Sequence, residues 1–179
     1  MTECHRHWTS IVTIQSIGAV TEIRIPVFTT AAQVVALKDQ MQAAIARVTS
    51  SGQFILDREV QCFEEEFANY CGVKAAVGVG NGTDAIELAL RAVGVTSNHE
   101  VITVANTAPF TGLAILAIGA TPVFVDVTDR QMLMDPARLL AAISPKTKAI
   151  LPVNLYGETC NLNRIMTIAR TRDLSVVVD

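Results

Sequence analysis

The chain has 179 residues, of which half are hydrophobic and 17% are charged. This composition excludes a disordered protein, and the length supplies a core that needs neither a disulfide nor a structural metal. Fourteen Lys and Arg against seventeen Asp and Glu give a net charge of −3, which argues against nucleic acid or a membrane surface as partner. No apolar run reaches the roughly 18 residues of a spanning helix, so we predict a soluble, globular protein.

The N-terminal residues differ from the rest of the chain. They lack any stable periodicity, so we expect a poorly ordered lead-in over residues 1–24 and a folded part over residues 25–179. Cys4, His5 and His7 carry groups that zinc binds, but no second ligand cluster accompanies them, and we predict no metal site. The four cysteines show no CxxC spacing and follow no signal peptide, which is typical of reduced thiols in the cytoplasm.

Two helices are expected first. Apolar residues recur at helical spacing over residues 32–50, and Gly52 ends the run. A second helix ends at Gly72. Its larger apolar residues share one stripe: Val60, Phe63, Phe67 and Tyr70. Its acidic run Glu64–Glu66 is most simply a solvated face.

Short β-rich runs then alternate with helical stretches. We expect strands at residues 75–79, 101–105, 122–127, 149–154 and 175–179. Helices are expected between them at residues 84–93, 110–118, 136–143 and 162–171, with Asp135 capping the third of these. The alternation predicts an α/β fold, a mainly parallel sheet with flanking helices.

One expected strand–helix junction is rich in glycine. Residues 77–84 read Val-Gly-Val-Gly-Asn-Gly-Thr-Asp. Glycines let backbone N–H groups approach a ligand, and the positive end of a helix dipole attracts phosphate, to which Thr83 adds a hydroxyl. The segment is neither a Walker loop nor a GxGxxG fingerprint, and taken alone it more often indicates an ordinary turn.

Further blocks surround this junction in a fixed order. Gly-Gln-Phe-Ile-Leu begins at Gly52, and Glu-Val-Ile-Thr-Val-Ala-Asn-Thr begins at Glu100. Gly-Ala-Thr-Pro-Val-Phe-Val-Asp-Val follows from Gly119, and Ile-Leu-Pro-Val-Asn-Leu-Tyr-Gly from Ile150. With these blocks, residues 25–179 resemble the DegT/StrS family of sugar aminotransferases, pyridoxal-phosphate (PLP) enzymes of the type I aminotransferase fold.

The resemblance implies a cofactor site. Gly82 and Thr83 would bind the cofactor phosphate, with Asp84 beginning the helix. Asp179 occupies the place of the acidic residue that pairs with the pyridine nitrogen and keeps it protonated, so that the ring can take up electrons. Ala108 stands where the family often places an aromatic residue against the ring.

Three positions depart from the family pattern: Ala108, Asn154 and Val178. Phe110, two residues after Ala108, is a candidate substitute for the missing aromatic ring, although a phenylalanine on a helix more often belongs to the core. The family's His before Leu-Tyr-Gly is Asn154 here, and its Glu before the strand-end Asp is Val178. Ring stacking and the hydrogen bonds around the site are therefore expected to differ from the family's.

The resemblance also implies a Schiff-base lysine, which this chain does not provide. Its four lysines are Lys38, Lys74, Lys146 and Lys148. None matches the family's catalytic position, so we assign no catalytic residue and expect the isolated chain to bind PLP weakly or not at all. We interpret residues 25–179 as the N-terminal part of the large domain, with unpaired strand edges, marginal stability and a homo- or hetero-oligomeric partner that carries the remainder.

The implied function is amino transfer from an amino-acid donor to a nucleotide-linked keto-sugar in polysaccharide or deoxysugar biosynthesis, once a second chain completes the site. The alternative is a catalytically inactive remnant that binds a phosphorylated ligand or a paralogous subunit. A generic α/β nucleotide-binding module is a third and weaker interpretation.

Overall fold

The computed structural model describes Pro26 and Phe28–Asp179. The predicted lead-in, with Cys4, His5 and His7, lies outside the described residues. The chain divides into two compact units, one ending at Ala76 and the other running from Val77 to Asp179.

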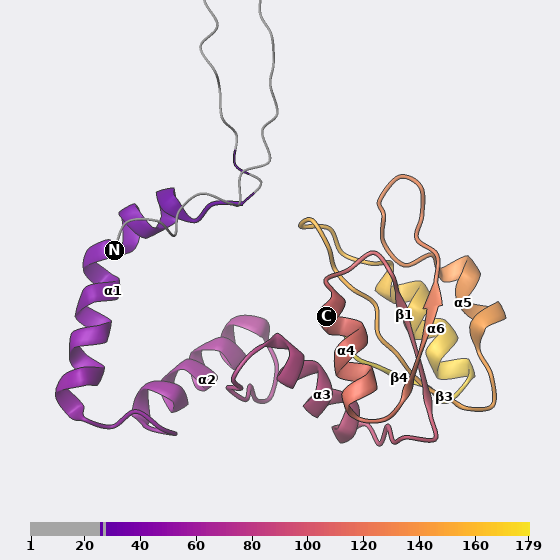
Figure 1. Ribbon diagram of the computed structural model, residues 1–179, viewed down its shortest axis with the longest axis horizontal. Coiled ribbons are helices and arrows are strands. Elements are labelled where there is room, and N and C mark those ends of the chain that lie inside the picture. Colours follow the sequence, from indigo (N-terminus) through magenta and orange to yellow (C-terminus); the bar gives the residue numbers. More distant parts are fainter. Residues whose placement is uncertain (1–25, 27) are drawn as a thin grey trace, which may run out of the picture. The chain divides into compact units, whose positions relative to one another are not determined.

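The first unit contains two helices, α1 (Ala31–Ser51) and α2 (Arg58–Cys71) (Figure 1). Each ends at a glycine in the left-handed conformation, Gly52 at φ 67° and Gly72 at φ 66°, as the sequence predicts. The N–H of Val73 returns to the carbonyl of Ala68 at 3.0 Å, which satisfies the last turn of α2.

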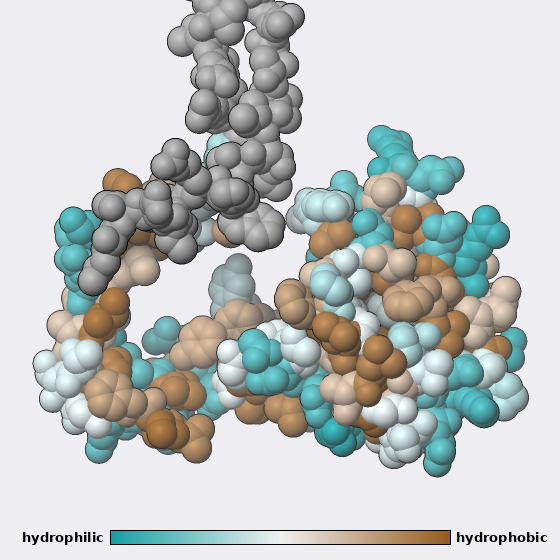
Figure 2. Space-filling view, in the orientation of Figure 1, coloured by the Kyte–Doolittle hydropathy of each residue, from teal (hydrophilic) through white to brown (hydrophobic). Residues whose placement is uncertain are grey.

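The apolar side chains of these two helices are largely exposed. No residue of α1 is buried, and α2 buries Ala68 alone. Phe63 and Phe67 stack with ring centroids 5.6 Å apart, which confirms the predicted stripe, but Tyr70 at its end is 88% exposed. Figure 2 shows hydrophobic residues at the surface of this unit. The stripe is therefore available to a partner rather than part of a core.

The second unit is an α/β sandwich. Its elements follow in the order α3 (Gly82–Ala92), β1 (Glu100–Val104), α4 (Pro109–Ala117), β2 (Thr121–Val125), α5 (Pro136–Ala142), β3 (Thr147–Ile150), α6 (Leu162–Thr171) and β4 (Ser175–Val176). All strand pairs are parallel, in the order β2-β1-β3-β4. The predicted α/β fold class and the four later helices and strands are confirmed, with end shifts of up to four residues.

Two apolar layers hold this sheet between its helices. Val101 of β1 packs with Leu90 of α3 and Ile115 of α4 on one face. Ile102, the next residue along β1, packs on the opposite face with Ile165 of α6. Alternate residues of one strand thus enter different cores, as side-chain alternation requires. Figure 1 shows the strands between α4 and α5.

The strand predicted at residues 75–79 is wrong. The backbone there is irregular up to Asn81, and Val77 is 76% exposed. A strand requires a neighbour for its backbone hydrogen bonds, and none of the four strands pairs with this segment. β-rich composition alone therefore does not form a strand at this position.

Candidate cofactor site

The glycine-rich segment leads directly into helix α3, which Asn81 caps. Its side-chain Oδ1 accepts a hydrogen bond from the N–H of Asp84 at 2.9 Å, and the N–H of Ala85 donates to the carbonyl of Asn81 at 3.1 Å. The second bond is the first intrahelical one, and of the four N–H groups that begin a helix without intrahelical partners the first bond satisfies that of Asp84. Within the described residues, the N–H groups of Gly82 and Thr83 have no hydrogen-bond partner and remain available to a ligand.

Gly80 and Gly82 of this segment differ in the space that surrounds them. A Cβ on Gly80 would stand 2.9 Å from the Asp84 carboxylate oxygen Oδ2, so any larger residue there would displace this carboxylate. A Cβ on Gly82 would meet nothing within 4 Å, and its φ is not positive. The fold itself therefore tolerates a side chain at Gly82.

Asp179 is fixed by backbone pairing beyond the ends of β3 and β4. Its N–H donates to the carbonyl of Pro152 at 3.0 Å, and its carbonyl accepts from the N–H of Asn154 at 2.8 Å. These bonds continue the parallel ladder to the carboxyl-terminal edge of the sheet. Ligands of open α/β sheets bind at this edge.

The Asp179 carboxylate touches helix α4. The hydroxyl of Thr111 donates to its Oδ2 at 2.6 Å, and the hydroxyl of Thr107 lies 2.9 Å from that of Thr111. Thr111 is 2% exposed, while Asp179 is exposed. Within the described residues, Oδ1 of Asp179 accepts no hydrogen bond and is therefore available to a ligand.

A pocket of about 610 Å³ unites the start of α3, the start of α4 and Asp179. Its lining consists of Asn81, Gly82, Thr83, Asp84, Ile86, Ala108, Phe110, Thr111 and Asp179. All five predicted cofactor-binding positions (Gly82, Thr83, Asp84, Ala108 and Asp179) are in this set. The volume lies within the range of small-molecule sites, about 300–1,000 Å³.

Sequence reasoning did not assign roles to Asn81 and Thr111. The signal for Asn81 was present, because an Asn three residues before an Asp at a helix start is a capping pattern. Thr111 gave a weaker signal, a single polar side chain within the otherwise apolar helix α4 (Pro109–Ala117).

The pocket can hold a phosphorylated, ring-bearing cofactor. The two free N–H groups and the Thr83 hydroxyl suit a phosphate at a helix N-terminus. Across the pocket, Asp179 Oδ1 suits a protonated ring nitrogen. The apolar side chains of Ile86 and Phe110 lie in the same lining and suit a planar ring.

Asn154 does not reach the pocket. Its side-chain oxygen accepts from the N–H of Cys160 at 2.9 Å, which closes the loop that follows β3. The Cys160 thiol donates to the carbonyl of Val153, and burial raises its pKa. Asn154 thus supports the loop beneath the site rather than a ligand.

No lysine of the second unit lines the pocket. Lys146 precedes β3 and Lys148 lies in its first half, at the amino-terminal edge of the sheet. Asp179 follows the carboxyl-terminal end of β4, at the opposite edge. Parallel strands keep these two edges apart by their own length.

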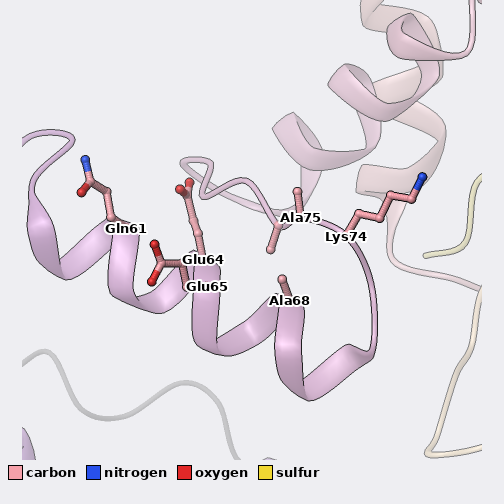
Figure 3. Close-up of a pocket in the computed structure, with 7 residues that line it drawn as sticks. Gln61, Glu64, Glu65, Ala68, Lys74 and Ala75 are labelled. Atoms are coloured by element: carbon pink, nitrogen blue, oxygen red, sulfur yellow. The ribbon is translucent and has the colours of Figure 1, made fainter.

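Another hollow, of about 240 Å³, lies along α2 in the first unit (Figure 3). Gln61, Glu64 and Glu65 line it, and Lys74 points away from the two carboxylates. Two acidic side chains repel phosphate, so this hollow does not compete as the cofactor site.

The sequence profile of the DegT/DnrJ/EryC1/StrS aminotransferase family matches residues 35–179. The chain belongs to this family. The predicted resemblance is thereby confirmed, and dependence on PLP is a property of the family.

Individual relatives and solved structures support this family membership. A dTDP-3-amino-3,4,6-trideoxy-alpha-D-glucose transaminase of Micromonospora megalomicea subsp. nigra is 49% identical over 136 residues, which cover 76% of this chain and 36% of the relative. The crystal structure of S. venezuelae DesV in complex with a ketimine intermediate has a TM-score of 0.83 at 40% identity and covers 87% of this chain and 42% of DesV.

A structure of NtdA from Bacillus subtilis with bound cofactor PMP has a TM-score of 0.76 at 33% identity. It covers 78% of this chain and 32% of NtdA. The chain therefore spans between about a third and two fifths of the length of these proteins.

No helix in the part of the chain that the structure describes is long and apolar enough to cross a membrane. Among Pro26 and Phe28–Asp179, no group of three His, Cys, Asp or Glu side chains comes together as a metal site.

Proposed function

We propose that the pocket between α3, α4 and Asp179 binds PLP or its amine form, pyridoxamine phosphate, and that it serves amino transfer to a nucleotide-linked keto-sugar. The observation that carries this proposal is the convergence of two free N–H groups and a free carboxylate oxygen on one pocket. The substrate class rests on the name of the Micromonospora relative, a dTDP-sugar transaminase.

Each part of the pocket has a distinct task. The N–H groups of Gly82 and Thr83 bind phosphate oxygens, and the Thr83 hydroxyl adds a third donor. Asp179 Oδ1 holds a proton on the ring nitrogen, while the Phe110 side chain excludes water from the ring. When bound, the cofactor supplies the electron-accepting ring and carries the amino group between the two substrates.

We expect the lysine that this chemistry requires to come from outside these 179 residues, because neither lysine of the second unit lines the pocket and neither Lys38 nor Lys74 matches the family's catalytic position. We propose that a second polypeptide or segment contributes it and that the amino-acid donor and the sugar nucleotide bind in the completed site. The absence of lysine from the lining also favours a second candidate function, binding of a phosphorylated ligand without catalysis.

The test uses pyridoxamine phosphate, which lacks an aldehyde and cannot react with surface lysines. Its fluorescence is titrated with the 179-residue chain, with Asp179→Asn and with Lys146→Gln as a matched surface control. We expect weak but saturable binding, weakened about tenfold further by Asp179→Asn and unchanged in the control. No saturable binding would refute the cofactor proposal. If inorganic phosphate binds as tightly as pyridoxamine phosphate and displaces it, the ring contributes no affinity. That result would favour the second candidate function, binding of a phosphorylated ligand without catalysis.

A further inference from the structure

We propose that Thr111, supported by Thr107, is a positioning residue that holds the Asp179 carboxylate in one orientation, with Oδ2 engaged and Oδ1 left for the ring nitrogen. The inference rests on the proposed function for the ring, but the hold on Asp179 itself is a property of this chain alone.

The backbone of Asp179 is already fixed on both sides by its bonds to Pro152 and Asn154. What remains free is the rotation of the side chain, which decides where the two carboxylate oxygens lie. The Thr111 hydroxyl, 2.6 Å from Oδ2, is the one side-chain contact that restrains it among the described residues. The orientation of the carboxylate therefore depends on this single hydroxyl.

The direction of each hydrogen bond from Thr107 through Thr111 to Asp179 follows from the number of protons that each group carries. The Thr111 hydroxyl has one proton, and it donates that proton to Oδ2 of Asp179. The contact of 2.9 Å between the two threonine hydroxyls then requires Thr107 to donate and Thr111 to accept. Each hydroxyl that accepts a hydrogen bond becomes a stronger donor, so Thr107 strengthens the bond from Thr111 to Asp179.

The placement of Thr111 is not explained by packing. It lies in the first turn of α4, a helix whose other side chains are apolar, and it is 2% exposed. A buried hydroxyl costs free energy unless it is hydrogen-bonded, and valine would fill the same space without that cost. Its partner lies 68 residues further along the chain and in the pocket lining.

A merely structural role, tying the end of the sheet to α4, is the competing explanation. Thr103 provides the matched control because it is also a fully buried threonine with one hydrogen bond, from its hydroxyl to the carbonyl of Leu151 at 2.9 Å. Thr103→Val removes a comparable bond without touching Asp179.

The experiment compares the wild-type chain with Thr111→Val, Thr111→Ser, Thr107→Val and Thr103→Val. The first readout is ligand-free: the three-bond proton couplings of Asp179, measured by NMR, distinguish one side-chain rotamer from an average. The second is the dissociation constant for pyridoxamine phosphate.

We expect a single Asp179 rotamer in the wild type, in Thr111→Ser and in Thr103→Val, and averaged couplings in Thr111→Val. Affinity for pyridoxamine phosphate should fall about tenfold in Thr111→Val, less in Thr107→Val, and not at all in Thr111→Ser or Thr103→Val. Rescue by serine excludes an effect of misfolding.

Averaged couplings in the wild type, unchanged couplings in Thr111→Val, or full affinity in that variant would overturn the inference. If the couplings respond to Thr111 but no variant binds pyridoxamine phosphate, the hold on Asp179 stands and the cofactor proposal fails. The two failures are thus distinguishable.

Discussion

Asn81 and Asp84 bond to each other in both directions at the start of helix α3. The Asn81 oxygen accepts from the backbone N–H of Asp84 at 2.9 Å, and its amide nitrogen donates to the Asp84 carboxylate at 3.1 Å. This reciprocal cap fixes the first turn of α3 and gives one oxygen of the Asp84 carboxylate a hydrogen-bond donor at the helix N-terminus.

Removing this cap should affect both stability and binding. We expect Asn81→Ala to lower the free energy of unfolding by about 1 kcal/mol and to weaken pyridoxamine phosphate binding. Asn161 caps α6 through its own side chain, away from the pocket, and Asn161→Ala is the matched control. Urea denaturation and fluorescence titration should show equal destabilisation of the two variants but lost affinity in Asn81→Ala alone. Lost affinity in both would attribute the effect to stability.

Gly82→Ala should separate the fold from the site. Because a Cβ there meets nothing within 4 Å, and alanine favours helix over glycine, we expect unchanged or slightly raised stability, by roughly 0.5–1 kcal/mol. The methyl group would occupy the approach to the Gly82 N–H, so phosphate affinity should fall. Gly112→Ala, in α4 and with 3.8 Å to the nearest atom, is the control that gains stability without losing affinity. Undiminished binding by Gly82→Ala would place the phosphate elsewhere.

Phe110 should contribute to ring binding in place of the family's aromatic residue at position 108. It is 57% exposed and lines the pocket, whereas Leu113, one turn on, is 51% exposed and does not. We expect Phe110→Ala to weaken pyridoxamine phosphate more than inorganic phosphate, since only the former has a ring. Leu113→Ala should change the affinity for neither ligand. Equal losses of affinity for both ligands in Phe110→Ala would mean that Phe110 does not contact the ring.

The reactivity of the Cys160 thiol should show whether the loop that follows β3 stays closed. Burial raises the pKa of its thiol, so the fraction of reactive thiolate at neutral pH is smaller than for an ordinary cysteine. We expect iodoacetamide to modify the exposed Cys71 first and Cys160 only after unfolding, as mass spectrometry would show. Because burial also raises the pKa of Cys160, a moderate rise in pH should leave Cys160 unmodified while the chain stays folded. Early modification of Cys160 would mean that the loop opens in the native chain.

Much of the fold followed from the sequence because its signals are local. Gly72 ends α2 and Asp135 caps α5, its Oδ1 accepting from the N–H of Ala137 at 2.8 Å. The strand predicted at residues 75–79 was wrong because a strand depends on a neighbour, which composition does not reveal. For the same reason, the contact of Thr111 with Asp179 lay beyond sequence reasoning, since nothing local relates two residues so far apart.

The exposure of α1 and of the α2 stripe bears on the predicted need for a partner. We expect the purified chain to self-associate through the first unit, whose unpartnered apolar side chains contribute little to a core, while the second unit unfolds cooperatively. Light scattering and calorimetry test this, and Phe67→Ser should reduce self-association. A monomeric chain, or a second unit that unfolds without a cooperative transition, would contradict the expectation.

In the proposed site, Asp179 keeps a proton on the ring nitrogen of a cofactor bound at the start of α3. The most direct test is the ¹⁵N chemical shift of ring-labelled pyridoxamine phosphate bound to the chain, at a pH where the free ligand has lost that proton. We predict the shift of a protonated ring nitrogen with the wild type and of an unprotonated one with Asp179→Asn. The same unprotonated shift with both proteins would contradict the account.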